Sequence, residues 1–150
     1  MIANIAAALA LAAAQAGSPV QSNLEYVAPI AGSWSYAATA TGSEATFATT
    51  AAQPQVTIRC TRATRRVSIL KLSSAASPTL WVWTSSQSKI LPATFDAANA
   101  RSISELAAYD PLLDAIAASR GRVGFSTSGL SALVVPPWGE IARVIEDCRV

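Results

Sequence analysis

Apolar and polar side chains alternate in short segments along most of the chain after Trp34. Neighbouring side chains of a strand point to opposite faces of a sheet, so this alternation predicts β-strands. Residues such as Gly42 and Pro92 separate the segments and predict turns. Ser102 and Glu105 also match a capping box that would start a helix, but alternation there favours a strand. The predicted strands cover residues 33–38, 46–50, 55–60, 66–72, 79–84, 89–94, 101–106, 123–127 and 130–135.

Two later segments have the spacing of amphipathic helices instead. Asp110 and Pro111 predict the start of the first helix, because aspartate caps helix N-termini and proline is favoured at the first helical position. This helix is expected to end at Gly121. A second helix is expected from Pro137 onward, with four apolar residues on one face at i, i+3, i+4 and i+7: Ile141, Val144, Ile145 and Cys148.

Both cysteines fall on the apolar side of their elements. Alternation places Cys60 on the same strand face as Val56 and Ile58, and Cys148 lies on the inner face of the second helix. We therefore expect this helix to dock on the sheet that carries Cys60, with a disulfide between the two cysteines. Two buried, unpaired thiols are the alternative. A crosslink between residues so far apart removes denatured-state entropy worth roughly 4 to 5 kcal/mol.

These elements predict one α+β domain over residues 34–150, β-rich and with a C-terminal helix. We expect an antiparallel, twisted sheet of about eight strands, arranged as a sandwich or a partly closed barrel and covered by the two short helices. The last two strands are expected to form a hairpin closed by Ser128 and Gly129. Residues 17–33 contain few large apolar side chains and are expected to form a loose N-terminal arm.

The first sixteen residues have the features of a signal peptide. Ile5 to Ala14 is an uninterrupted apolar run, and Ala14-Gln15-Ala16 has the small-x-small spacing that a signal peptidase accepts before Gly17. The run is too short to span a bilayer as a helix. One usual feature of a signal peptide, a lysine or arginine before the apolar run, is missing. We expect cleavage, no transmembrane segment afterwards, and a periplasmic or secreted protein, which suits a disulfide.

The composition excludes several kinds of chemistry. The chain contains no histidine, and its net charge is only +2. A Ser-His-Asp site is therefore impossible, and most metalloenzyme and proton-relay sites lose their commonest residue. The spacing of Ser86 and Lys89 matches a Ser-x-x-Lys motif, but it lies between strand signals and not on a helix. We expect no enzyme, no cofactor, no metal site and no nucleic-acid partner.

Four arginines lie close together around the first cysteine: Arg59, Arg62, Arg65 and Arg66. Guanidinium groups bind phosphate and sulfate, so this cluster could hold an acidic envelope polymer such as lipopolysaccharide. The alternative is a charged sheet edge that resists aggregation.

Two tryptophans, Trp81 and Trp83, share one strand face, opposite Leu80 and Val82. An open face of this kind would offer two indole rings to sugar rings or to an apolar partner surface. If a helix covers the face, the same rings belong to the core, which an alanine-rich chain needs large aromatic residues to fill.

Three motifs stand out in the second half of the chain: Asp110-Pro-Leu-Leu-Asp-Ala, Ser119-Arg-Gly-Arg122 and the segment from Glu140 to Arg149. In these motifs the chain resembles a group of small exported proteins of unknown function from sphingomonad-type α-proteobacteria. More distantly, the order of Trp34, a strand ending in Arg59-Cys60, a helix, a hairpin and Cys148 resembles the invasion-associated locus B family and the accessory periplasmic proteins of type VI secretion. The resemblance implies a β-rich envelope domain without a described catalytic site.

Together these features predict an exported, non-catalytic domain that binds another envelope protein or an envelope polymer. The alternative is a module for glycans or lipid headgroups that uses the Trp81/Trp83 face or the Arg59–Arg66 cluster.

Overall fold

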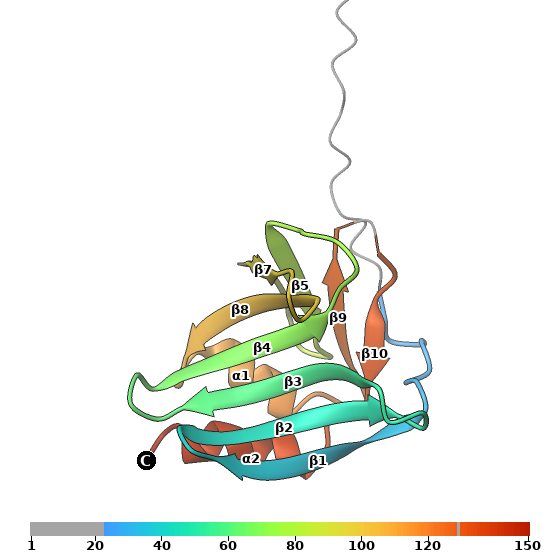
Figure 1. Ribbon diagram of the computed structural model, residues 1–150. Coiled ribbons are helices and arrows are strands. Elements are labelled where there is room, and N and C mark those ends of the chain that lie inside the picture. Colours follow the sequence, from blue (N-terminus) through green and yellow to red (C-terminus); the bar gives the residue numbers. More distant parts are fainter. Residues whose placement is uncertain (1–22, 129) are drawn as a thin grey trace, which may run out of the picture.

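The computed structural model describes residues 23–128 and 130–150, which form two antiparallel sheets and two short helices (Figure 1). One sheet has six strands in the order β1-β2-β3-β4-β8-β7, and the other has four in the order β10-β9-β5-β6. In Figure 1, β9 and β10 run across the direction of β1 to β4. The elements are β1 (Gly32–Thr39), β2 (Gly42–Thr49), β3 (Pro54–Thr61), β4 (Arg66–Leu72), β5 (Thr79–Trp83), β6 (Ser88–Pro92), β7 (Thr94–Asp96), β8 (Arg101–Ala107), α1 (Pro111–Ala117), β9 (Val123–Thr127), β10 (Leu133–Val135) and α2 (Gly139–Asp147).

The predicted α+β class is confirmed, and of the two predicted arrangements the sandwich is the one found. The predicted signal peptide over residues 1–16, the first part of the predicted N-terminal arm and Gly129 lie outside the described residues. Among the described residues, neither helix is long and apolar enough to cross a membrane.

The described part of the structure has ten strands instead of about eight. One predicted segment divides into two strands, and another strand is longer than predicted. The strand expected from residue 46 already begins at Gly42, which pairs with Thr61 of β3. A Cβ atom at Gly42 would overlap the carbonyl oxygen of Cys60, so this close strand approach needs a glycine.

The segment predicted as one strand over residues 89–94 is two strands in different sheets. Its first part, β6, pairs with β5, and β7 pairs with β8 of the other sheet. Proline cannot donate to a ladder, so β6 ends at Pro92. Between the two strands the N–H of Ala93 bonds to the carbonyl of Pro78 at 2.9 Å. The chain therefore changes sheets at this point.

The last predicted strand is also shorter than expected. Only Leu133–Val135 pairs with β9, whereas Leu130 is exposed and its N–H bonds to Thr127 in a turn. Val134 and Val135 point to opposite faces and are both buried, as the apolar run predicted.

The main core lies between the two sheets and under the two helices. The inner face of the six-stranded sheet meets apolar residues of the second sheet, such as Leu80 and Phe125, in one cluster. Burying each such side chain stabilises the fold by roughly 1.5–3 kcal/mol. The helices add their predicted apolar faces to the same cluster, through Leu112, Leu113, Ile116, Ile141, Val144 and Ile145.

A second, smaller cluster lies on the outer face of the four-stranded sheet and contains Leu24, Trp81 and Val134. The described part of the arm, from Asn23 onward, is therefore docked and not loose as expected. Gly124 of β9 makes the docking possible, because a Cβ atom there would overlap the side chain of Leu24. Further along, the N–H of Ile30 bonds to the carbonyl of Val134 at 2.9 Å.

Candidate functional site

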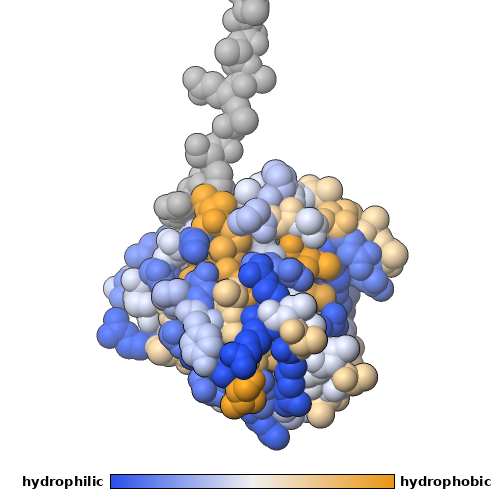
Figure 2. Space-filling view, turned by 90° about the vertical axis from the view of Figure 1, so that its left-hand side faces the viewer, coloured by the Kyte–Doolittle hydropathy of each residue, from blue (hydrophilic) through white to orange (hydrophobic). Residues whose placement is uncertain are grey.

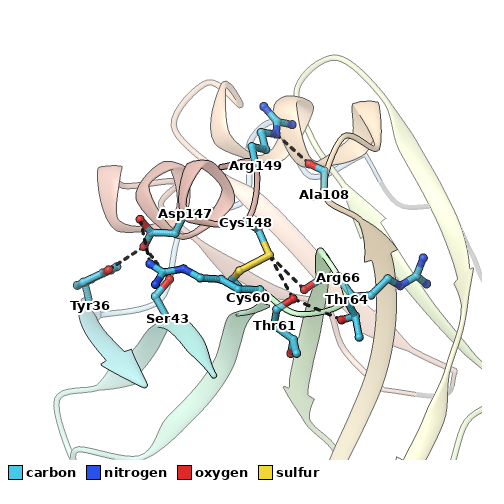
Figure 3. The surroundings of a disulfide bond; sticks show 11 residues. Tyr36, Ser43, Cys60, Thr61, Thr64, Arg66, Ala108, Asp147, Cys148 and Arg149 are labelled. Carbon is cyan, nitrogen blue, oxygen red and sulfur yellow. Dashed lines mark hydrogen bonds and ion pairs between the residues drawn. A yellow bond between two sulfur atoms is a disulfide. The ribbon is translucent and has the colours of Figure 1, made fainter. Parts of the chain in front are cut away.

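Cys60 and Cys148 form the predicted disulfide, which joins the end of β3 to the end of α2 (Figure 3). Their Cα atoms lie 5.4 Å apart, and the bond closes a loop of 88 residues. Both cysteines are buried, and α2 packs on β1, β2 and β3 as expected. The alternative of two unpaired thiols is wrong.

The Arg59–Arg66 cluster lies on β3, β4 and the hairpin between them, in the middle of the six-stranded sheet. It is therefore not a sheet edge. Three of its side chains face a carboxylate: Arg59 Nε lies 3.0 Å from Glu44, Arg66 Nε 3.9 Å from Glu105, and Arg62 4.0 Å from Asp147. The fourth, Arg65, is exposed. Carboxylates that already face these cations leave little unpaired charge for an anionic ligand.

The surface around this hairpin shows no continuous apolar area. Figure 2 views the face that carries the hairpin and the C-terminus, and there hydrophobic patches are separated by hydrophilic ones.

The exposed ion pairs of the Arg59–Arg66 cluster contribute about 0–1 kcal/mol each to stability. The cluster therefore adds charge to this surface and little energy to the fold.

Asp147 is held by two hydroxyl groups beside the disulfide (Figure 3). Tyr36 Oη and Ser43 Oγ each donate to its carboxylate at 2.7 Å. The hydrogen bond from Tyr36, followed by the smaller effect of the one from Ser43, lowers the pKa of Asp147 from its usual 3.8, whereas burial acts to raise it. The two hydrogen bonds also compensate for a negative charge at the C-terminal end of a helix, where the dipole disfavours it. The group anchors α2 to β1 and β2.

Arg149 connects the chain end to the start of α1. Its guanidinium lies 2.9 Å from Asp114 and 3.2 Å from Glu146, and its Nε donates to the carbonyl of Ala108 at 2.8 Å. The hydrogen bond to Asp114 raises the pKa of Arg149 further above its ordinary value. Asp110 caps the same helix by accepting the N–H of Leu112 at 2.9 Å, as predicted.

The two tryptophans of β5 do not form an open pair of rings. Trp81 is only 6% exposed and lies under Leu24, so it is covered by the N-terminal segment and not by a helix. Trp83 is half-buried, and it lines a hollow at the end of the strand. Of the two predicted rings, only that of Trp83 can meet a ligand.

This hollow has a volume of about 530 Å³, and three segments far apart in the sequence form its wall. They are the N-terminal segment, the turn between β5 and β6, and the loop between α1 and β9. Its lining residues are Asn23, Glu25, Trp83, Thr84, Ser85, Ser86, Gln87, Ser88, Arg120 and Arg122. The wall thus combines one large aromatic ring, several neutral hydrogen-bonding groups and three charges.

Ser85 and Ser119 connect the turn after β5 to the loop between α1 and β9 by hydrogen bonds. Ser119 Oγ accepts the N–H of Ser85 at 2.9 Å, and Ser85 Oγ accepts the N–H of Arg120 at 2.9 Å. Ser119 Oγ also donates to the carbonyl of Arg122 at 2.6 Å. Reciprocal bonds of this kind fix the backbone on which Arg120 and Arg122 stand relative to the turn that follows Trp83.

Neither of the two arginines of the hollow faces a carboxylate among the described residues. Within residues 23–128 and 130–150, no carboxylate oxygen lies within 4.0 Å of Arg120 or Arg122. The Nε of Arg122 is buried and has no hydrogen-bond acceptor in this part of the chain. A buried donor without an acceptor costs about 1–3 kcal/mol.

The described residues of the hollow do not form the Ser-x-x-Lys arrangement considered from the sequence. Ser86 is on its wall, but the Nζ of Lys89 lies 3.8 Å from Asp110 and the segment is a turn. The described residues also contain no group of three or more acidic or cysteine side chains that could hold a metal ion. What the wall can do is stack a ring on Trp83, donate hydrogen bonds and pair with a negative charge.

A second hollow, of about 460 Å³, lies on the outer face of the six-stranded sheet. Two arginines line it, but Arg59 faces Glu44, and Arg101 donates to the carbonyl of Pro54 at 3.3 Å. Its described lining residues include no aromatic ring. We therefore take the hollow at Trp83 as the candidate site.

Sequence reasoning placed Trp83 in the site but missed Arg120, Arg122 and Gln87. The Ser119-Arg-Gly-Arg122 motif was visible, yet nothing in the sequence brings it next to β5. Comparison with known proteins finds no matching family model, no similar curated protein and no similar solved structure.

Proposed function

We propose that this protein is an exported, non-catalytic domain that binds a glycan of the cell envelope in the hollow at Trp83. The observation that carries the proposal is the meeting of Trp83 with two arginines that have no carboxylate partner among the described residues. The hollow is open to one side of the molecule and can take a sugar unit of a longer chain.

The chemistry of the wall suits a sugar. The C–H face of a pyranose ring stacks on indole, and the hydroxyl groups of a sugar pair with amide, hydroxyl and carboxylate groups such as those of Gln87, Ser88 and Glu25. The turn that carries most of these groups is ordered by its own bonds, with Thr84 Oγ1 donating to the carbonyl of Gln87 at 2.7 Å.

The residues that line the hollow favour binding of a glycan over its hydrolysis. Most glycosidases use two carboxylic acids that flank the scissile bond, roughly 5 to 10 Å apart. Glu25 is the one carboxylate among the described residues of the wall. The chemistry available at the hollow is therefore recognition.

Export is supported by the disulfide, because paired thiols persist in oxidising compartments. The predicted signal peptide and the distant resemblance to envelope proteins agree with it. A periplasmic or secreted location follows as part of the proposal.

The test is binding of purified, oxidised protein to a panel of envelope and plant oligosaccharides, measured by tryptophan fluorescence and calorimetry. We expect at least one glycan to bind and Trp83→Ala to weaken it about tenfold, since an aromatic contact contributes about 0.5–1.5 kcal/mol beyond area burial. Trp83→Phe should retain most of the affinity. Trp138→Ala, at an exposed tryptophan outside the hollow, is the matched control. Failure of the whole panel to bind would overturn the proposal.

A protein partner is the second candidate, because three apolar side chains of the N-terminal segment are exposed. Tyr26 is 87% exposed, and Val27 and Ile30 are exposed as well. Substituting all three by serine should abolish capture of a specific envelope protein and leave glycan binding unchanged. Unchanged capture would exclude this surface.

A further inference from the structure

Two sets of arginines in this protein differ in their surroundings. Near the disulfide, Arg59, Arg62, Arg66 and Arg149 all face a carboxylate, and Arg143 stacks over the Tyr36 ring at 3.7 Å. At the hollow, Arg120 and Arg122 have neither kind of partner within the described residues. Guanidinium groups left without a carboxylate beside an open hollow are available for one that arrives with a ligand.

The backbone that carries these two arginines is held in a fixed conformation before any ligand arrives. Gly121 between them has a φ of +73°, a left-handed conformation that L-residues with a side chain rarely adopt. The bonds of Ser119 and Ser85 fix both ends of the same turn. A site that is already arranged loses less entropy when it binds.

The charge of the wall selects the kind of anion. Arg120, Arg122 and Glu25 are the charged residues among the described lining residues, which leaves one net positive charge. A carboxylate carries a single negative charge, whereas a phosphate monoester carries about −1.5 to −2 at neutral pH. The planar guanidinium fork also matches a carboxylate with two parallel hydrogen bonds.

From these observations we infer that the hollow recognises a sugar acid, whose ring stacks on Trp83 and whose carboxylate pairs with Arg122 and Arg120. This inference rests on the proposed glycan-binding function and narrows its ligand class to uronic-acid-type units.

The test compares an oligogalacturonate with the same oligomer after methyl esterification, which removes the charge and leaves the sugar rings. We expect wild-type protein to bind the acid about tenfold to a hundredfold more tightly, the range of hydrogen bonds between charged groups. Arg122→Gln should abolish most of this preference, and Arg120→Gln a smaller part. Arg65→Gln is the matched control, because Arg65 is exposed and lies outside the hollow.

Several results would overturn the inference. Equal affinity for the acid and the ester would overturn it and leave the proposed glycan function in place. Stronger competition by glucose 6-phosphate than by glucuronate would have the same consequence. A preference for the acid that survives Arg120→Gln and Arg122→Gln together would remove the two arginines from the site. Binding of neither oligomer would also overturn it, and the wider glycan panel then decides the proposed function separately.

Discussion

The two ends of α1 differ in whether the charged residues beside them are paired. At its start, which we call the braced end, Asp110 caps the helix and Arg149 pairs with Asp114, close to the Cys60–Cys148 disulfide. Beyond its C-terminus, at what we call the open end, Arg120 and Arg122 face the hollow without a carboxylate among the described residues. Charges at the braced end should therefore contribute stability, and charges at the open end should contribute affinity.

The largest expected effect comes from breaking the disulfide of the braced end. Cys60→Ser, Cys148→Ser and the double variant should each lose about 4 to 5 kcal/mol of unfolding free energy, because all three remove the same loop closure. Urea unfolding of the three variants measures this. A loss in the double variant equal to the sum of the single losses would contradict a shared bond.

Arg149→Gln should have the next largest effect, about 2 kcal/mol, because Arg149 is mostly buried and bonds to two carboxylates and a carbonyl. Thermal and urea unfolding give the value, and ligand affinity should not change. If Arg149→Gln weakened ligand binding and left stability intact, the comparison between the two ends would be reversed.

Asp147→Asn should cost about 1 to 2 kcal/mol at pH 7, since Tyr36 and Ser43 then donate to a neutral group. The pKa of Asp147 is lowered in the folded state, so its stabilisation is present above the unfolded value near 3.8 and is lost as the pH falls below it. The difference between the wild type and the variant should therefore shrink between pH 5 and pH 2. Urea unfolding curves of both proteins across this pH range measure the difference. A stability difference that stays constant with pH would show that the charge of Asp147 is not its cause.

Ser119→Ala should cost about 1 kcal/mol, because it removes one side of the tie between the two loops of the open end. Its effect should not add to that of Ser85→Ala in a double-mutant cycle. Affinity for the ligand should fall in both variants, since the arginines lose their fixed backbone. Additive losses would show that the two serines act independently.

The smallest expected effect is that of Arg120→Gln on stability, within about 0.5 kcal/mol, as for most exposed surface substitutions. Urea unfolding beside Arg149→Gln provides a direct contrast between the two ends. A loss for Arg120→Gln as large as that for Arg149→Gln would remove the distinction drawn here.

Local patterns predicted the braced end well. Alternation along β3 and the helical spacing of α2 placed Cys60 and Cys148 on facing surfaces, and the Asp110-Pro111 pair marked the start of α1. Such signals lie within a few residues of each other, so one segment is enough to read them. Where a strand consists of small and polar residues, as at the start of β2, the same signal disappears.

The open end could not be predicted in the same way. The Arg59–Arg66 cluster is conspicuous in the sequence, but Glu44, Glu105 and Asp147, which face it, come from other strands and from α2. Arg120 and Arg122 attract less attention, and only the folded chain brings them beside Trp83. Pairing of charges between distant segments is a tertiary property that no local pattern contains.

The disulfide also determines how the molecule responds to a pulling force. If the chain is stretched from its two ends, the covalent link bypasses the segment between the bonded cysteines, which are 88 positions apart. Only β1, β2 and most of β3 can then be peeled away, while β4 through α2 bear no tension along the backbone. Reduction would release about 300 Å of additional contour length, at roughly 3.3–3.6 Å per residue. In the oxidised domain, most of the two sheets is therefore shielded from the pulling force.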